Sequence, residues 1–154
     1  MKIISHRGNI NGPNPEKENR PSYIDSALQL GFEVEVDLWY IQNEFWLGHD
    51  EPQYKIEITW MKLRKNKIWY HCKNQLSSVK LLELNDGYKF FCHRNDEYVL
   101  TSNGHLWVHD LNSKINDMCI IPLLSESELF KHKNLKPGYV CTDFVNKLYA
   151  LGDE

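Results

Sequence analysis

The sequence lacks the features that mark membrane-spanning, secreted and nucleic-acid-binding proteins. No apolar run approaches the roughly 20 residues that a membrane span requires. The N-terminus reaches the polar residues Ser5 and His6 too early for a signal peptide. Long basic runs are also missing, and the net charge of −3 gives no electrostatic case for nucleic acid or an anionic membrane. These absences predict a soluble, cytoplasmic protein without a nucleic-acid partner.

Paired-cysteine motifs are missing as well. The four cysteines are Cys72, Cys92, Cys119 and Cys141, and no two of them form a C-x-x-C pair. Each falls inside an apolar segment that is predicted to be a strand. We therefore expect four reduced core residues in a protein from a reducing compartment.

What the sequence does contain is the composition of a folded globule. Of its 154 residues, 42% are hydrophobic, 12% aromatic and 25% charged. This balance favours a packed core over disorder. The length suits one domain over residues 1–154, without internal repeats or low-complexity segments.

Strand-like and helix-like segments alternate along the chain. This alternation predicts an α/β fold of the (β/α)₈ TIM-barrel type. Eight complete units of average length need about 190 residues, so several outer helices must be shortened or missing. The clearest case is the link 102–105, which is too short for a helix. Strands are predicted at 2–6, 33–38, 68–72, 89–92, 98–101, 106–109, 118–123 and 139–142, with a short extended piece at 45–47. Helices are predicted at 21–31, 58–65, 74–87 and 144–151, and a short helix is predicted to begin at Ser125.

The segment Glu33–Leu38 carries the strongest chemical signal. In a strand, side chains alternate between faces, so Glu33, Glu35 and Asp37 share one face. These carboxylates repel one another unless a cation lies against them. Glu35 and Asp37 are hard oxygen ligands suited to Mg²⁺ or Ca²⁺. The alternative is an exposed edge strand with a charged outer face.

Histidines and cations occur at or near the predicted strand ends. Chemistry in barrels of this type gathers at the C-terminal ends of the strands. Histidine exchanges protons near neutral pH, so His6 and His49 are candidates for a general base and a general acid. Arg7 and Lys73 would offer positive charge to a phosphate group, or would form salt bridges.

Four short motifs occur in order along the chain: His6-Arg7-Gly8, Glu18-Asn19, Glu35-Val36-Asp37 and Gly48-His49-Asp50. Together they resemble the signature of the glycerophosphodiester phosphodiesterase family. The resemblance implies a TIM barrel and a metal-dependent hydrolase that cleaves small-molecule phosphodiesters. By resemblance, His6 is the general base and His49 the general acid, Glu35 and Asp37 are ligands of a divalent metal ion, and Arg7 and Glu18 organise the phosphate site.

The third strand departs from the family pattern. Where the family has Glu-x-Lys, this chain has His71-Cys72-Lys73, so Lys73 matches and His71 replaces the third carboxylate ligand. Imidazole suits Mn²⁺ or Zn²⁺ better than Mg²⁺ or Ca²⁺. Either the metal differs, or its affinity is lower, or His71 contacts the substrate. His93, after the fourth strand, is expected at the substrate. The family's insertion that shapes the glycerol pocket is missing, which leaves the alcohol groups open.

Two other functions compete with the hydrolase. A lyase of the same superfamily would stop at a cyclic phosphate. A non-catalytic phosphate-binding barrel is favoured by His71 and by the short chain, whereas the joint presence of the other polar residues favours an enzyme. A barrel that lacks outer helices exposes apolar surface, and this favours a homo-oligomer.

Overall fold

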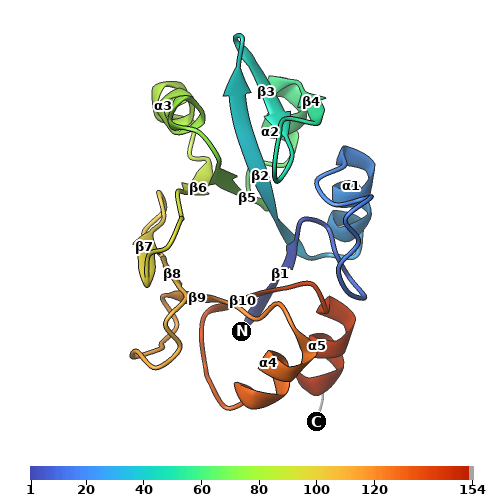
Figure 1. Cartoon of the computed structure of the whole chain (residues 1–154), viewed down its shortest axis with the longest axis vertical. Coiled ribbons are helices and arrows are strands. Elements are labelled where there is room, and N and C mark those ends of the chain that lie inside the picture. Colours follow the sequence, from blue (N-terminus) through green and yellow to red (C-terminus); the bar gives the residue numbers. More distant parts are fainter. Residues whose placement is uncertain (153–154) are drawn as a thin grey trace.

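A computed structural model describes residues 1–152, in which helices surround one curved sheet (Figure 1). The strands of this part of the chain are β1 Lys2–His6, β2 Glu33–Ile41, β3 Glu44–Leu47, β4 Tyr54–Ile56, β5 Ile68–Cys72, β6 Lys89–Phe91, β7 Tyr98–Leu100, β8 Leu106–Val108, β9 Cys119–Pro122 and β10 Tyr139–Thr142. The helices are α1 Pro21–Gln29, α2 Ile58–Leu63, α3 Gln75–Leu84, α4 Glu126–Lys131 and α5 Val145–Gly152.

Eight strands follow one another around a ring in the order β6–β5–β2–β1–β10–β9–β8–β7. Neighbouring strands in this order are parallel except β7 and β8, which are antiparallel. The eight match the eight predicted strands. The fold is a mixed α/β structure with a curled sheet, consistent with a reduced TIM-like barrel.

The ring is interrupted between β6 and β7, where no strand pairing joins the two within residues 1–152. The Ser102 backbone N–H donates a hydrogen bond to the carbonyl oxygen of Phe90 at 2.8 Å. The Ser102 hydroxyl accepts from the Phe90 N–H and donates to the Tyr88 carbonyl, both at 2.9 Å. Strands β7 and β8 pair antiparallel, because the short link 102–105 that joins them cannot carry a crossover connection.

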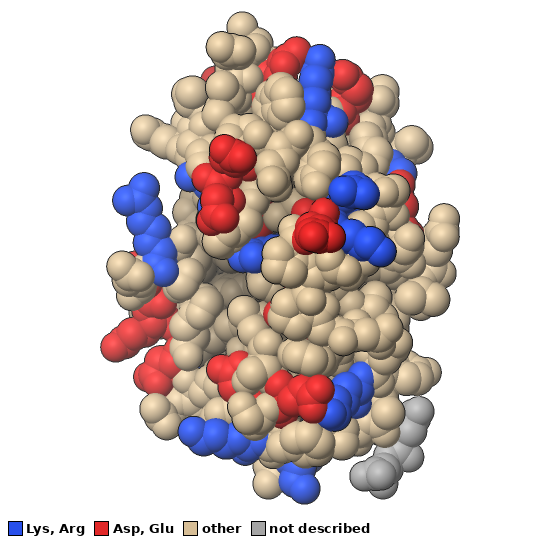
Figure 2. Space-filling view, turned by 45° about the vertical axis from the view of Figure 1, so that its right-hand side comes forward, with Lys and Arg blue, Asp and Glu red and all other residues tan. Residues whose placement is uncertain are grey.

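Within residues 1–152, outer helices are missing from the segment between β6 and β9. No residue of the described range between β6 and β9 is helical, whereas a helix follows each of β1, β5, β9 and β10. Within residues 1–152, no helix has the length and apolar character needed to cross a membrane. Acidic and basic side chains are interspersed on the face of the molecule shown in Figure 2.

Strand β2 runs three residues further than predicted and forms a hairpin with β3. Gln42 and Asn43 make the two-residue turn, with φ angles of 53° and 62°. Positive φ at both central positions is the geometry of a tight hairpin turn, and asparagine tolerates it better than most residues. Strand β4 continues this antiparallel extension, which lies outside the ring (Figure 1).

The side chains of β2 alternate between the two faces of the sheet, as the sequence pattern predicts. Val34, Val36 and Leu38 are fully buried in a core cluster with residues of α1, α2 and α3. Glu33, Glu35 and Asp37 are also buried, on the opposite face. The alternative of an exposed edge strand is therefore wrong for this segment.

The first of the three carboxylates is held by protein groups. Glu33 Oε2 accepts a hydrogen bond from Trp69 Nε1 at 2.6 Å and another from Lys89 Nζ at 2.6 Å. Lys89 Nζ also lies 4.3 Å from the centroid of the Trp69 ring. The cation against Glu33 is therefore a lysine, and only Glu35 and Asp37 remain for another partner.

Replacing Lys89 with methionine is expected to lower the free energy of unfolding by about 1–3 kcal/mol, because a buried carboxylate loses a charged hydrogen-bond donor. Urea denaturation followed by tryptophan fluorescence would measure the loss. Lys67→Met, at an exposed neighbouring lysine, is the matched control. Equal unfolding midpoints for the two variants would show that this ion pair contributes nothing.

Helix α3 turns a different face to the core from the one expected. We expect its stripe Leu76, Val79 and Leu82 to pack inward, but all three are exposed, while Ser77 and Leu81 are buried. The reason lies at the helix start. The side chain of Asn74 hydrogen-bonds both the N–H and the carbonyl of Tyr40 and caps the helix at the Ser77 N–H, which fixes the rotation of α3 against β2. The exposed stripe is apolar surface of the kind that motivated the prediction of a homo-oligomer, which stays a prediction.

The cysteine prediction is wrong at one position. Cys72, Cys119 and Cys141 are buried and Cys92 is exposed, and all four are free thiols. Strand β6 ends at Phe91, one residue earlier than expected, so Cys92 lies in the following loop.

Candidate active site

The register of three parallel strands brings the predicted site residues together. His6 at the end of β1 lies opposite Glu35 on β2. Asp37, two residues later on β2, lies opposite His71 on β5. Parallel strands place their carboxyl ends at one rim, so these four side chains converge there.

Glu35, Asp37 and His71 form a cluster with the donor set of a metal site. Their ligand atoms all lie within 4.8 Å of one another. His71 Nδ1 is 3.2 Å from Asp37 Oδ1 and 3.8 Å from Glu35 Oε1. His71 Nε2 lies 3.1 Å from the carbonyl oxygen of His93, an acceptor that holds the proton on Nε2 and directs Nδ1 at the carboxylates.

Two carboxylate oxygens of this cluster have no hydrogen-bond partner. Glu35 Oε2 and Asp37 Oδ1 are buried, and neither receives a hydrogen bond from any residue in the range 1–152. Unpartnered buried carboxylate oxygens are unfavourable in a protein interior. A divalent cation would satisfy both, so the residues fit the metal that the sequence predicts.

The two carboxylates have opposite electrostatic environments. Burial, and then the charge of Asp37, raises the pKa of Glu35 above its usual value. Burial acts in the same direction on Asp37, but the close contact with His71 and the charge of Arg7 outweigh it and hold the pKa of Asp37 well below its usual range. Asp37 therefore stays ionised in the fold, whereas the ionised form of Glu35 is unfavourable in its environment.

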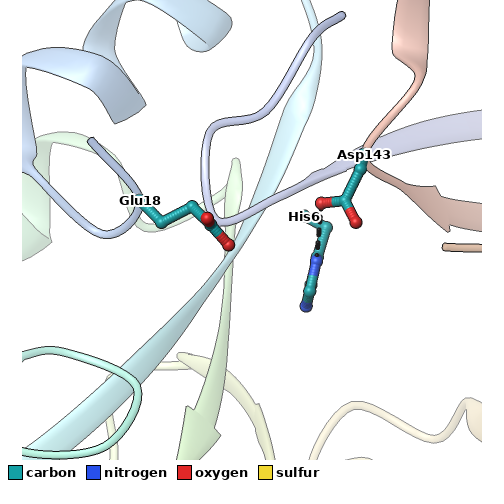
Figure 3. Close-up of side chains that lie close together, drawn as sticks. All are labelled: His6, Glu18 and Asp143. Atoms are coloured by element: carbon teal, nitrogen blue, oxygen red, sulfur yellow. Dashed lines mark hydrogen bonds and ion pairs between the residues drawn. The ribbon is translucent and has the colours of Figure 1, made fainter. Parts of the chain in front are cut away.

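His6 is oriented by Asp143, the residue after β10 (Figure 3). His6 Nδ1 lies 2.8 Å from Asp143 Oδ1, an oxygen that also accepts a hydrogen bond from Asn9 Nδ2 at 2.7 Å. His6 Nε2 faces the cluster, 3.8 Å from Glu35 Oε2. Burial alone would lower the pKa of His6, but the Asp143 hydrogen bond and the charge of Glu35 raise it overall.

The loop after β1 adds an arginine and a positioning asparagine. Arg7 Nε is 3.0 Å from Asp37 Oδ2, and Arg7 Nη1 is 3.3 Å from Glu18 Oε1. Asn19 Nδ2 donates to Asp37 Oδ2 and Asn19 Oδ1 accepts from the Asp37 N–H, both at 2.9 Å. Arg7 and Asn19 have φ angles of 55° and 63°, in the left-handed region that most side chains avoid. Backbone strain of this kind is often held at functional sites.

The remaining predicted residues lie around this centre. Lys73 Nζ is 3.8 Å from Asp37 Oδ1. His49 is half-exposed, pairs with Asp50 at 2.8 Å, and lines a cavity of about 440 Å³ together with His6. His93 lines a different cavity, of about 740 Å³, and its ring stacks on His109.

The second cluster of possible metal ligands is His6, Glu18 and Asp143 (Figure 3). Its histidine nitrogen Nδ1 already bonds Asp143, and Glu18 lies beside Arg7. These groups thus have protein partners, unlike the open oxygens of Glu35 and Asp37. The first cluster is therefore the better candidate for a metal site.

Comparison with known proteins identifies the class of fold. The crystal structure of glycerophosphodiester phosphodiesterase from Agrobacterium tumefaciens str. C58 matches 100% of this chain over 100% of its own length, with a TM-score of 0.62 and 13% sequence identity. No family model and no curated protein sequence matches the chain. At this identity, the likeness shows that the chain shares the fold of that phosphodiesterase.

Proposed function

We propose that the protein is a metal-dependent phosphodiesterase that acts on small-molecule phosphodiesters. The observation that carries the proposal is the pair of open, buried carboxylate oxygens on Glu35 and Asp37, beside a histidine whose ring Asp143 orients. The fold shared with a glycerophosphodiester phosphodiesterase supports the same conclusion.

Glu35, Asp37 and His71 would hold the divalent cation. When bound, the cation supplies charge that neutralises the phosphate oxygens and polarises the phosphorus centre. Two carboxylates favour Mg²⁺ or Ca²⁺, and the imidazole of His71 makes Mn²⁺ or Zn²⁺ the alternatives.

His6 acts as the general base. Its Nδ1–H donates to Asp143, which leaves the Nε2 lone pair facing the cluster. The carboxylate behind the ring stabilises the imidazolium that forms when Nε2 accepts a proton. The proton comes from the attacking hydroxyl, which belongs either to the substrate or to a water molecule.

The remaining polar residues bind the phosphate and protonate the leaving group. Arg7 and Lys73 both lie beside Asp37 and supply positive charge where the phosphate must approach. His49 lines the same cavity as His6 and acts as the general acid that protonates the leaving oxygen. Glu18 holds the Arg7 guanidinium at Nη1, whereas Asp37 contacts Nε.

Product analysis by phosphorus NMR tests the reaction class. EDTA-treated protein is incubated with glycerophosphocholine and glycerophosphoglycerol, first alone and then with Mg²⁺, Ca²⁺, Mn²⁺ or Zn²⁺. We expect a phosphomonoester to appear only after one or more metals are restored. A cyclic phosphate that accumulates without opening would identify a lyase. An unchanged diester signal with every metal, from protein shown to be folded, would overturn the proposal.

A further inference from the structure

A cavity of about 740 Å³ opens beside the catalytic centre, at the ends of β5 and β6. Two segments line it: residues 71–75 with Ser78, and residues 92–96. The proposed reaction uses only the inner edge of this cavity, which His71 and Lys73 form. The outer part therefore has no role in the chemistry derived so far.

The cavity adjoins the proposed metal and phosphate site through these two residues. His71 contacts Asp37 through Nδ1 and the His93 carbonyl through Nε2, so one ring spans both regions. Lys73 lies 3.8 Å from Asp37 and lines the same cavity. A phosphate bound between Lys73 and Arg7 would direct one of its two alcohol arms into this space.

The charges that line this cavity differ from those around His6. Its lining includes two cations, Lys73 and Arg94, and one carboxylate, Asp96. The cavity around His6 has the opposite balance, with Arg7 as its only arginine or lysine. Its four carboxylates are Glu18, Asp50, Glu51 and Asp143. The two sides of the reacting phosphate are therefore of opposite electrostatic character.

Arg94 is available to a ligand. Within residues 1–152, its guanidinium forms no hydrogen bond or ion pair, although the loop around it is held. The Arg94 N–H donates to Asp96 Oδ2 at 3.3 Å, and His93 Nε2 donates to the Asp96 carbonyl at 3.0 Å. The ring of His93 is packed on His109, with 3.6 Å between ring centroids.

The opposite wall adds to the positive potential. Asn74, Gln75 and Ser78 belong to the cap and first turn of α3, a helix of 10 residues that begins at this cavity. The N-terminal end of a helix carries partial positive charge from its free N–H groups. Polar side chains at the start of α3 therefore line the same cavity as Arg94.

We propose that this cavity receives one alcohol arm of the phosphodiester and that this arm carries a second anionic group, a carboxylate or a phosphate, bound by Arg94. The inference rests on the proposed function and deepens it by naming the substrate class. The other arm, in the acidic cavity beside His6, is neutral or cationic.

Two glycerophosphodiesters of matched shape test this. One has 3-hydroxypropionate as its second alcohol and the other has 3-hydroxypropionamide, so a carboxylate is compared with an isosteric amide. Phosphorus NMR with the activating metal gives kcat/KM for both. We expect the wild-type protein to prefer the carboxylate by about tenfold or more, the size of one charge-assisted hydrogen bond.

Three variants locate the preference. Arg94→Gln is expected to bring the ratio of the two kcat/KM values close to one, whereas Asp96→Asn is expected to raise it. Lys62→Gln removes an exposed positive charge on α2 and is expected to leave the ratio unchanged. Equal rates for the two esters, or a ratio that Arg94→Gln does not alter, would overturn the anionic-arm inference alone. Failure to cleave either ester with any metal would overturn the proposed function and this inference with it.

Discussion

Replacing His6 with alanine is expected to lower kcat by about 10²–10⁴-fold, the usual contribution of a positioned general base. The variant should still fold, because His6 lies at the rim of the sheet and its partner Asp143 keeps the hydrogen bond from Asn9. Steady-state kinetics and circular dichroism on the same preparation would measure both properties. His132→Ala, at the end of α4, is the matched control and should keep wild-type activity.

A related prediction concerns Asp143, whose carboxylate hydrogen-bonds His6. In Asp143→Asn, the ring loses the anion that raises the pKa of His6. A general base works when it is unprotonated, so activity rises as the pH increases through that pKa. The midpoint of this rise should therefore move to lower pH, with a smaller loss of kcat than in His6→Ala. Wild-type kcat in His6→Ala, or an unmoved pH midpoint in Asp143→Asn, would contradict the assigned roles.

Neutralising Glu35 and Asp37, the two carboxylates proposed to bind the metal, is expected to have opposite effects on stability. Asp37 has ionic contacts with Arg7 and His71 and hydrogen bonds with Asn19, so Asp37→Asn should lower the free energy of unfolding by about 3 kcal/mol. Glu35 has an unpartnered buried oxygen and a raised pKa, so its charge is unfavourable in the fold. Glu35→Gln should therefore be at least as stable as the metal-free wild type.

Both substitutions should nevertheless remove metal binding. Wild-type protein is expected to gain Tm when the activating metal is added, because a ligand that binds only the folded state stabilises it. Glu35→Gln and Asp37→Asn should lose this gain together with phosphodiesterase activity. Scanning calorimetry with and without metal measures these effects. A Glu35→Gln protein that is destabilised like Asp37→Asn, or that keeps the metal-induced gain, would contradict the assignment of the metal to this cluster.

The positions of the ring strands could be predicted from local pattern alone. Each is a short apolar segment bounded by polar or turn residues, and the link 102–105 excludes a helix by its length. The capping-box spacing from Ser125 to Glu128 likewise predicts the start of α4, where both reciprocal hydrogen bonds are present. The extended piece at 45–47 corresponds to β3, but the extension of β2 is harder to predict, because Gln42-Asn43 is a weaker hairpin signal than Asn-Gly or Asp-Gly.

The orientation of α3 could not be predicted from its own residues. Leu76, Val79 and Leu82 make a plausible apolar stripe, and helical periodicity favours that face. The rotation depends instead on hydrogen bonds between Asn74 and Tyr40, which lie 34 positions apart. Contacts between distant segments leave no trace in a helix's own periodicity.

The candidate site likewise combines residues predictable from local pattern with residues that depend on contacts between distant segments. His6, Glu35, Asp37 and His71 were found because each ends or lines a predicted strand, and parallel strands share one rim. The hydrogen bonds from His6 and Asn9 to Asp143 join residues 137 and 134 positions apart. They depend on the pairing of β1 with β10, so Asp143 could be noticed only as a polar residue at a strand end. Asn9 carried no signal at all.

The central claim is that this site cleaves phosphodiesters with a metal held by Glu35 and Asp37. The most direct test is hydrolysis of bis(p-nitrophenyl) phosphate by EDTA-treated protein, before and after each divalent metal is added, with Glu35→Gln in parallel. We predict negligible hydrolysis without metal, recovery with at least one metal, and no recovery in Glu35→Gln. Hydrolysis that is equally fast in EDTA, or equally fast in Glu35→Gln, would contradict the claim.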